Sequence, residues 1–239
     1  MGQRIIFPLR RLPHLSRDEF QSYWLNRHAP LVAHHAETLG IIGYQQVHTT
    51  KEMRETAVPC FDGVAELWVD PSRASTDASA RRAASEALLD DERTFIDLAN
   101  SPIWIAEEDV RLEGSKEGLR MTAILRRNPA ITREQFRHHW RELHGPWALR
   151  NPEVFGFRHY VQNHTPADAD DNSLARDRNS PPAFDGVSEI YRNPPTASPE
   201  AVASLRQEFH EDEKNFLDID ASPVFEGRVH VIIGADKGA

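Results

Sequence analysis

The chain is poor in cysteine and in long apolar segments. Its 239 residues include a single cysteine, Cys60, which excludes an internal disulfide and any metal site built from several cysteines of one chain. No apolar run approaches the length that spans a membrane, and the first residues are not followed by the apolar core of a signal peptide. We therefore expect a cytoplasmic protein with no membrane partner.

The chain also lacks an excess of basic residues and the common cofactor motifs. Lys and Arg total 28 against 37 Asp and Glu, which gives a formal net charge of −9 and argues against general nucleic-acid binding. Neither a glycine-rich phosphate loop nor a His-Glu-x-x-His zinc motif is present. The sequence therefore predicts no nucleic-acid partner, no bound metal and no cofactor.

The sequence instead repeats itself, and this repetition organises the chain. Residues 4–11 return at 120–127 and residues 15–20 return at 131–136, an offset of 116. The same offset relates Trp24 to Trp140, His28 to His144, Pro30 to Pro146, Tyr44 to Tyr160 and His48 to His164. Offsets of 123 and 121 relate residues 61–64 to 184–187 and residues 101–102 to 222–223, because the loops differ in length. We predict two domains, residues 1–113 and 119–239, joined by the polar segment 114–118.

Each repeat is expected to contain strand, helix, strand, strand, helix and strand, in that order. Capping-box spacing at Ser16 and Thr132 predicts the start of the first helix of each repeat. Pro30 and Pro146 are expected to break or kink that helix just after its histidine. The second helices are expected to run to residue 100 and from residue 198 to the proline at 223. The other strands are expected at residues 41–48, 64–69, 103–112, 157–164, 187–191 and 224–233.

The order of these elements predicts the fold. The βαββαβ order is that of the ferredoxin-like unit, whose helices cover one face of an antiparallel sheet. The other face of such a sheet is left bare, and two copies can cover each other. We predict an α+β protein in which two ferredoxin-like βαββαβ repeats form an intramolecular dimeric α/β barrel.

Two short motifs carry a resemblance to a known family. Residues 20–31 read Phe-x-x-Tyr-Trp-x-x-x-His-x-Pro-Leu, and residues 44–48 read Tyr-x-Gln-x-His. Residues 136–146 and 160–164 follow similar patterns, and Asp-Gly-Val-x-Glu comes after each, at residues 62–66 and 185–189. Over nearly all of both repeats, this combination resembles the EthD family of dimeric α/β-barrel proteins.

The resemblance implies a ligand pocket in each repeat. The family is also similar to cofactor-free dehydratases, cyclases and decarboxylases that act on aromatic or polyketide-like carbonyl compounds. Related tandem barrels can hold haem, but the twelve histidines of this chain do not by themselves identify an iron ligand. His139 stands where the first repeat has Tyr23, and Asn163 stands where it has Val47, so the two pockets are expected to have diverged.

His28 and His144 are the first candidates for catalysis. An imidazole can take and return a proton near neutral pH, and a place at a helix C-terminus favours its protonated form. The alternative is that each histidine caps its helix and packs on the tryptophan one turn earlier. Trp24 and Trp140 are expected to line an apolar pocket.

Tyr44, Gln46 and His48 alternate along a strand and so share one face of the sheet. The second repeat offers Tyr160, Gln162 and His164 in the same way. A phenol and an imidazole on one wall could hold the oxygen of an enolate. The alternative is a polar wall that bonds local backbone, or an exposed strand end. The candidate catalytic residues are His28, His144, His48, His164, Tyr44 and Tyr160.

Carboxylates and one long loop complete the set of candidates. Glu66 and Glu189 lie inside strands, where a carboxylate needs a partner, and a histidine or an arginine could serve. The loop at residues 166–182 is expected to be a solvated insertion, or else a lid over a pocket. The candidate substrate-binding residues are Trp24, Trp140, Gln46, Gln162, Asn163, Glu66 and Glu189.

Three functions are compatible with these residues. The first is a cofactor-independent lyase of the dehydratase or cyclase type, in which a histidine acts as general acid and base on a small hydrophobic carbonyl compound. The second is a non-catalytic binding or accessory protein for a hydrophobic metabolite. The third is an oxygenase, either cofactor-free or dependent on haem or flavin. Tandem chains could also pair into homodimers.

Overall fold

The eight strands of the protein close into one antiparallel barrel. The computed structural model describes residues 3–169 and 172–234, so the outer ends of the two predicted repeats, residues 1–2 and 235–239, lie outside the described residues. Around the barrel the strands follow the order β1-β3-β2-β8-β5-β7-β6-β4. The strands are β1 Gln3–Leu9, β2 Ile41–Glu52, β3 Gly63–Val69, β4 Trp104–Leu112, β5 Arg120–Leu125, β6 Phe157–His164, β7 Gly186–Arg192 and β8 Val224–Ile233.

The barrel is made of two four-stranded sheets that join at their edges. Strands β4-β1-β3-β2 form the first sheet and β8-β5-β7-β6 the second. The sheets meet where β2 pairs with β8 and where β4 pairs with β6, so each junction joins one repeat to the other. The predicted α+β fold, an intramolecular dimeric α/β barrel, is confirmed.

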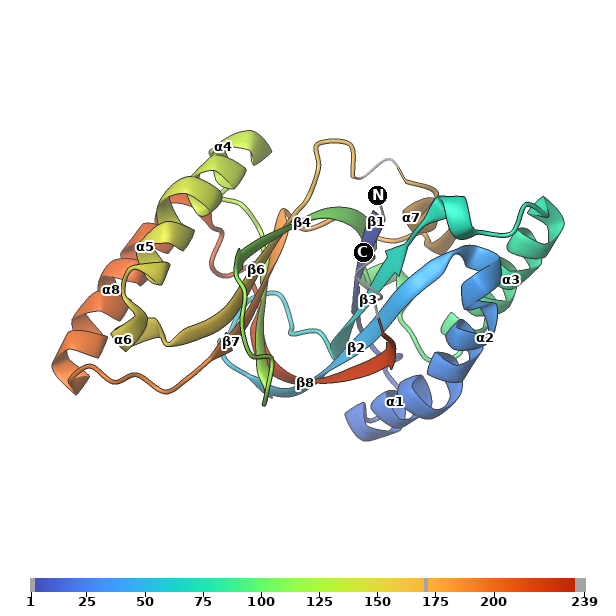
Figure 1. The fold of residues 1–239 in the computed structure, drawn as a ribbon, viewed down its shortest axis with the longest axis horizontal. Helices are drawn as coiled ribbons and strands as arrows, with labels where there is room; N and C mark the ends of the chain where they lie inside the picture. The colour runs from blue at the N-terminus through green and yellow to red at the C-terminus, as the bar shows by residue number, and fades with distance from the viewer. Residues whose placement is uncertain (1–2, 170–171, 235–239) are drawn as a thin grey trace.

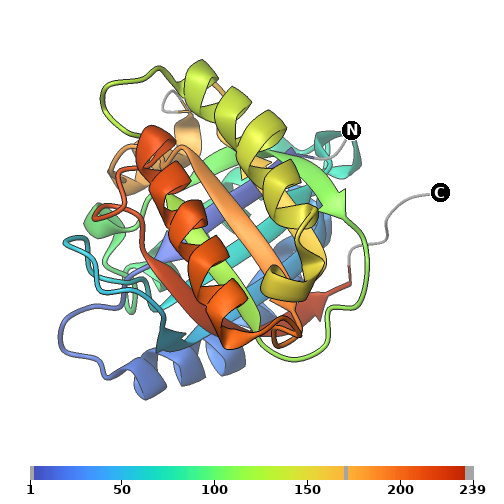
Figure 2. The same ribbon diagram turned by 90° about the vertical axis from the view of Figure 1, so that its left-hand side faces the viewer.

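Helices cover the outside of the barrel on two opposite sides. Helices α1 to α3 lie against the first sheet and α4, α5, α6 and α8 against the second, as Figure 1 shows. Figure 2 shows α8 and the α4–α5 helices lying across the second sheet. The helices are α1 Arg17–Tyr23, α2 Ala29–Leu39, α3 Ala78–Glu92, α4 Arg133–His138, α5 Gly145–Leu149, α6 Pro152–Phe155, α7 Ser173–Arg178 and α8 Pro199–Phe216. Among the residues that the structure describes, no helix is long and apolar enough to cross a membrane.

Of the two outcomes predicted for Pro30 and Pro146, a break or a kink of the first helices, the break is wrong. Both capping boxes are present, at Ser16 and Thr132, but the helix continues past each proline through one wide π-helical turn, Trp24–His28 or His139–His144. Each proline then lies in the first turn of the next α-helical segment, where its missing N–H is tolerated. The histidines are therefore inside a continuous helix, so no helix C-terminus lies beside them to favour their protonated form.

The second helix of the first repeat ends earlier than expected. Helix α3 ends at Glu92 instead of near residue 100. Beyond it, Phe95 turns inward to pack 5.5 Å from the Phe20 ring, and Ile96 forms a β-bridge with Arg11. These tertiary contacts draw the chain out of the helix before the proline at residue 102 is reached. In the second repeat, α8 starts after Ser198 as predicted and ends at Phe216.

Four charged side chains lie buried at the centre of the barrel. Arg4 and Arg120 each pair with both Glu66 and Glu189, so every arginine contacts one glutamate of its own repeat and one of the other. The Arg120–Glu66 contact is 2.5 Å and the Arg120–Glu189 contact 2.8 Å. Burial alone would raise the pKa of Glu66, but the charges of Arg120 and Arg4 outweigh it and lower that pKa to about 2. We name these four residues the central ion cluster.

The central ion cluster predicts a specific loss of stability. We expect Glu66→Gln to lower the free energy of unfolding at pH 7 by about 3–5 kcal/mol, because it leaves buried arginine charge uncompensated. Since folding lowers the pKa of Glu66, its stabilisation is present above the ordinary glutamate pKa and is lost as the pH falls towards about 2. Urea unfolding at several pH values should therefore show that the difference in unfolding free energy between wild type and variant decreases below about pH 4.

The matched control is Glu108→Gln. Glu108 also pairs with Arg4, but its side chain is 29% exposed. This substitution should cost about 1 kcal/mol or less at pH 7. Equal losses in the two variants would contradict a dominant role for the buried cluster.

Candidate active site

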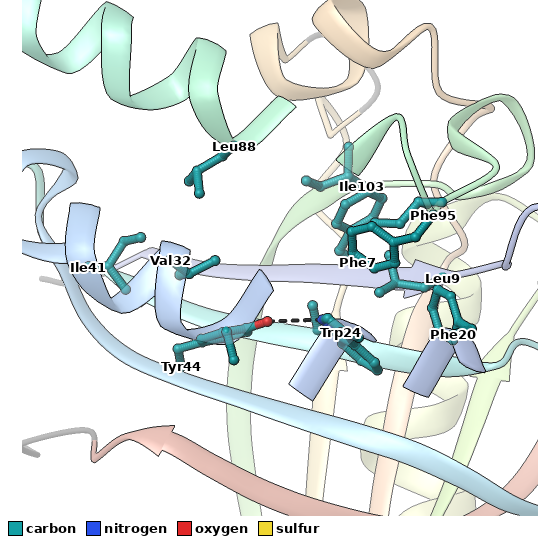
Figure 3. Packing of buried hydrophobic residues seen from close by; sticks show 13 residues of the cluster. Phe7, Leu9, Phe20, Trp24, Val32, Ile41, Tyr44, Leu88, Phe95 and Ile103 are labelled. Atoms are coloured by element: carbon teal, nitrogen blue, oxygen red, sulfur yellow. Dashed lines mark hydrogen bonds between the residues drawn. The ribbon is translucent and has the colours of Figure 1, made fainter. Parts of the chain in front are cut away.

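A cavity of about 560 Å³ lies between the outer face of the first sheet and helices α2 and α3. Strand β3 contributes Ala65 and Leu67 to its floor, so the alternation along β3 sends Glu66 into the barrel. Val32 from α2 and Leu88 from α3 form apolar walls on either side. Figure 3 shows part of this packing. The volume and the apolar lining are those of a small-molecule site.

His28 lines this cavity and is held by a carboxylate. Its Nδ1 lies 2.7 Å from Oδ2 of Asp91, near the end of α3, and the Tyr23 hydroxyl donates to the other oxygen of Asp91 at 2.7 Å. The hydrogen bond with His28 lowers the pKa of Asp91. An ionised Asp91 accepts a hydrogen bond from the Nδ1–H group of His28, and Nε2 is then the basic nitrogen of the ring.

Tyr44 presents a phenol to the same cavity. Its oxygen accepts a hydrogen bond from Trp24 Nε1 at 3.0 Å and another from Gln46 Nε2 at 2.7 Å. Figure 3 shows the Trp24 bond. Burial raises the pKa of Tyr44 well above its ordinary value. With both acceptor positions of its oxygen occupied, the neutral phenol has its own O–H left to donate.

Gln46 and His48 act behind the phenol, on the same strand face. The Gln46 amide also donates to the carbonyl of Trp24 at 3.0 Å, and His48 Nε2 lies 2.9 Å from Gln46 Oε1. His48 stacks on the Trp24 ring at 4.7 Å, and burial lowers its pKa to about 3. A neutral His48 donates to Gln46 and fixes the amide orientation. The predicted polar wall is present, but Tyr44 is the member that reaches the cavity.

The carbonyl of Trp24 ties this network to the wide helical turn. It accepts the Ala29 N–H across the π-helical turn as well as the Gln46 amide. The indole itself lies against Gly63, where an added Cβ would stand 2.6 Å from the ring. Packing against the indole therefore requires a residue without a side chain at Gly63.

The second repeat builds a similar cavity of about 390 Å³. His144 Nδ1 lies 2.7 Å from Asp212, and that hydrogen bond lowers the pKa of Asp212 to about 2. Tyr160 accepts from Trp140 at 3.1 Å and from Gln162 at 2.7 Å, and burial raises its pKa to about 12.

Two features distinguish the second cavity from the first. Ser188, where the first repeat has Ala65, is within hydrogen-bonding reach of the Tyr160 hydroxyl. Trp140 lines this cavity, whereas Trp24 does not line the first, so the expectation that both tryptophans line a pocket holds only for Trp140. The histidine behind the phenol is shared: His164 Nε2 lies 3.1 Å from Gln162, and burial lowers the pKa of His164 to about 4, as it lowers that of His48.

Each cavity is completed by a loop of the other repeat. Helix α7, in the loop at residues 166–182, contributes Leu174 and Arg178 to the first cavity, while residues 170–171 lie outside the described residues. Arg178 binds Glu92 through two hydrogen bonds of 2.7 and 2.8 Å. Arg54, from the shorter loop of the first repeat, binds Glu213 in the second cavity at 2.9 Å. The long insertion therefore covers the first cavity, on the opposite repeat.

Glu66, Glu189 and Asn163 lie inside the barrel. Within the described residues, none of the three lines either cavity. Asn163 Nδ2 donates to Glu189 at 2.6 Å. Of the two partners that the sequence predicts for these glutamates, the structure supplies the arginines of the central ion cluster.

Sequence comparison identifies the repeated unit. The family model described as "EthD domain" matches residues 12–99 and 128–220. The chain belongs to the EthD domain family. The predicted resemblance is confirmed, with one EthD domain in each repeat. A search of curated proteins gives no significant match.

Solved structures share the barrel of the two EthD domains. An anthrone oxidase-like protein is 10% identical with a TM-score of 0.57, and the alignment covers 100% of this chain and 96% of that one. A candidate monooxygenase from Lactobacillus acidophilus NCFM is 11% identical, with a TM-score of 0.47 and coverages of 96% and 95%. A mutant chlorite dismutase from Candidatus Nitrospira defluvii is 9% identical, with a TM-score of 0.46 and coverages of 95% and 91%. At these identities the likeness concerns the fold alone.

The sequence reasoning missed the carboxylates of both EthD domains. Asp91 and Asp212 hold the two histidines, and Glu92 and Glu213 receive the arginines from the opposite repeat. A signal was available, because the offset of 121 residues that relates the Ser-Pro pairs also relates these two Asp-Glu pairs. The described residues contain no group of three or more His, Cys, Asp or Glu side chains placed to hold a metal ion.

The Arg178–Glu92 contact predicts how the first cavity is kept covered. We expect Arg178→Ala to raise the amide hydrogen-exchange rate of Ser173–Arg178 by about tenfold or more, because a buried bidentate ion pair anchors α7. Exchange measured by mass spectrometry should leave α8 unchanged. The control is Arg54→Ala, which removes the equivalent contact to Glu213 and should leave α7 protected. Unchanged exchange in Arg178→Ala would show that other contacts hold the helix.

Proposed function

We propose that this EthD protein catalyses a reaction that starts with removal of a proton next to the carbonyl group of a small, hydrophobic ring compound. His28 is the base, and Tyr44 donates a hydrogen bond to the carbonyl oxygen. The observation that carries this proposal is the Asp91-held imidazole facing the same apolar cavity as a phenol with a free proton. The proposed class is a cofactor-independent lyase of the dehydratase or cyclase type.

The proposed dehydration balances without any other reactant. His28 Nε2 takes a proton from the carbon beside the carbonyl, and the electron pair of that bond moves to the oxygen, which accepts the Tyr44 O–H. The imidazolium, stabilised by ionised Asp91, then returns the proton to a hydroxyl on the adjacent carbon. This hydroxyl leaves as water while the carbon–carbon double bond forms. His28 ends in its starting state.

Three observations favour the first cavity as the place of reaction. It has the larger volume, about 560 Å³ against about 390 Å³. The first cavity has Ala65, which offers no hydrogen-bonding side chain, at the position of Ser188, whose hydroxyl interacts with that of Tyr160. Helix α7 covers the first cavity, and exclusion of water strengthens hydrogen bonds to a developing enolate.

A second candidate follows from the likeness to the anthrone oxidase-like structure. The same proton removal would give a carbanion that reacts with O2. One CH2 group and one O2 would then yield one new carbonyl group and one water, with the carbon oxidised and the oxygen reduced. The third candidate, an accessory protein, would bind the same ring compounds without removing any proton.

An exchange experiment separates the two enzymatic candidates, which both remove a proton, from the accessory protein, which does not. In D2O, NMR should show the protein exchanging the proton beside the carbonyl of ring ketones that bind to it, whatever step follows. We expect His28→Ala to lower this rate by about 10²–10⁴-fold, and Tyr44→Phe and Asp91→Asn to lower it with no loss of fold. His144→Ala should retain most of the rate.

Further outcomes assign the reaction class. Full exchange in a folded His28→Ala/His144→Ala variant would refute the acid–base proposal. Stoichiometric O2 uptake with enzyme present would favour the oxygenase, and release of water with O2 absent would favour the lyase. Binding of ring ketones with no exchange would favour the accessory protein. The absorption spectrum of the purified protein tests for haem or flavin.

A further inference from the structure

The second cavity differs from the first by two arginines at its mouth. Arg192, the last residue of β7, and Arg206, on α8, both line it. The offsets of 123 and 121 residues place Val69 and Ser85 at these positions in the first repeat, and both of those residues line the first cavity. An apolar and a small polar residue of the first repeat are thus replaced by two guanidinium groups, which adds two positive charges at these positions.

The carboxylates nearby leave these arginines largely uncompensated. Glu213 is already bound by Arg54, through contacts of 2.9 and 3.2 Å, and by His210 at 3.1 Å. Glu226 approaches Arg192 only to 3.9 Å, and Arg206 has no ion-pair partner within residues 3–169 and 172–234. Arg192 and Arg206 line the second cavity together and also line a neighbouring surface pocket together, so the two side chains lie near each other.

The interior of the second cavity is aromatic. Phe155, Phe157 and Phe209 line it, with Phe155 and Phe209 ring centroids 4.8 Å apart. A cavity of about 390 Å³ with aromatic walls accepts a molecule with one or two rings. Two adjacent guanidinium groups at its mouth match the geometry of a carboxylate, which arginine binds through paired N–H donors.

We propose that the second cavity binds a hydrophobic aromatic carboxylate, with its rings against the phenylalanines and its carboxylate between Arg192 and Arg206. This site is independent of the reaction proposed at His28. The chain has a net charge of −9, so two neighbouring and largely uncompensated arginines stand out against a background that repels anions. The second EthD domain is therefore a carboxylate-binding site built on the frame of the first.

Calorimetric titration with 2-naphthoate and its neutral isostere 2-naphthamide tests this proposal. We expect the wild-type protein to bind the acid at least tenfold more tightly than the amide, and less tightly as salt is added. Arg192→Val and Arg206→Ser install the residues of the first repeat. Each substitution should lower the affinity for 2-naphthoate by about tenfold or more and change the affinity for 2-naphthamide by less than about threefold. Arg206 is exposed, so its substitution should leave the fold intact.

The first cavity supplies the matched control. Arg82 lines its mouth, and Arg82→Ala should leave 2-naphthoate affinity unchanged. His28→Ala should leave it unchanged too, because the binding does not rest on the proposed reaction. Equal affinity for acid and amide, or no binding of either, would overturn the proposal. So would retention of the preference for the acid in the Arg192→Val/Arg206→Ser variant.

Discussion

The buried charges at the centre of the barrel have to neutralise one another, and this requirement holds the two repeats in register. Arg4 forms an ion pair with Glu189 of the other repeat, and Arg120 forms one with Glu66. A shift of one sheet against the other would leave a charge unpaired in the interior, which is far more costly than the loss of an exposed pair. With the sheets fixed, the loops after β2 and β6 cross the junctions and reach the opposite cavities. The cover of each cavity thus depends on an interaction made inside the barrel.

One side chain couples the two chemical groups of the first cavity. Gln46 donates hydrogen bonds to the hydroxyl of Tyr44 and to the carbonyl of Trp24. The same carbonyl accepts the hydrogen bond that closes the wide helical turn ending at His28. The phenol and the imidazole are therefore positioned by the same amide, whose orientation His48 fixes. A buried amide with all its partners in place is rigid, and rigidity of this kind keeps an acid–base pair in register with a bound ligand.

The sequence predicts the barrel well because the repeat supplies its own register. The segments of the first repeat recur in the second in the same order, at offsets of 116, 123 and 121 residues, and local propensity agrees with the fold. The expected break at Pro30 does not occur because the helix continues through a widened turn. Pro30 then lies in the first turn of the next α-helical segment, where its missing N–H is tolerated. Asp91 was missed because the contact with His28 joins two helices 63 residues apart. Likewise, the spacing within one repeat gives no sign that Arg178 serves the cavity of the other.

Comparison of the two repeats separates the residues that build a cavity from those that tune it. The tryptophan, tyrosine, glutamine, histidine and aspartate of the hydrogen-bond network occur in both, with matching contacts. Some of the differences fall at positions that line the cavities, such as Ala65 against Ser188 and Val69 against Arg192. A fixed network with variable walls allows the two cavities to take chemically different ligands. The duplication thus yields two cavities with one hydrogen-bond geometry around the imidazole and the phenol, and with different walls.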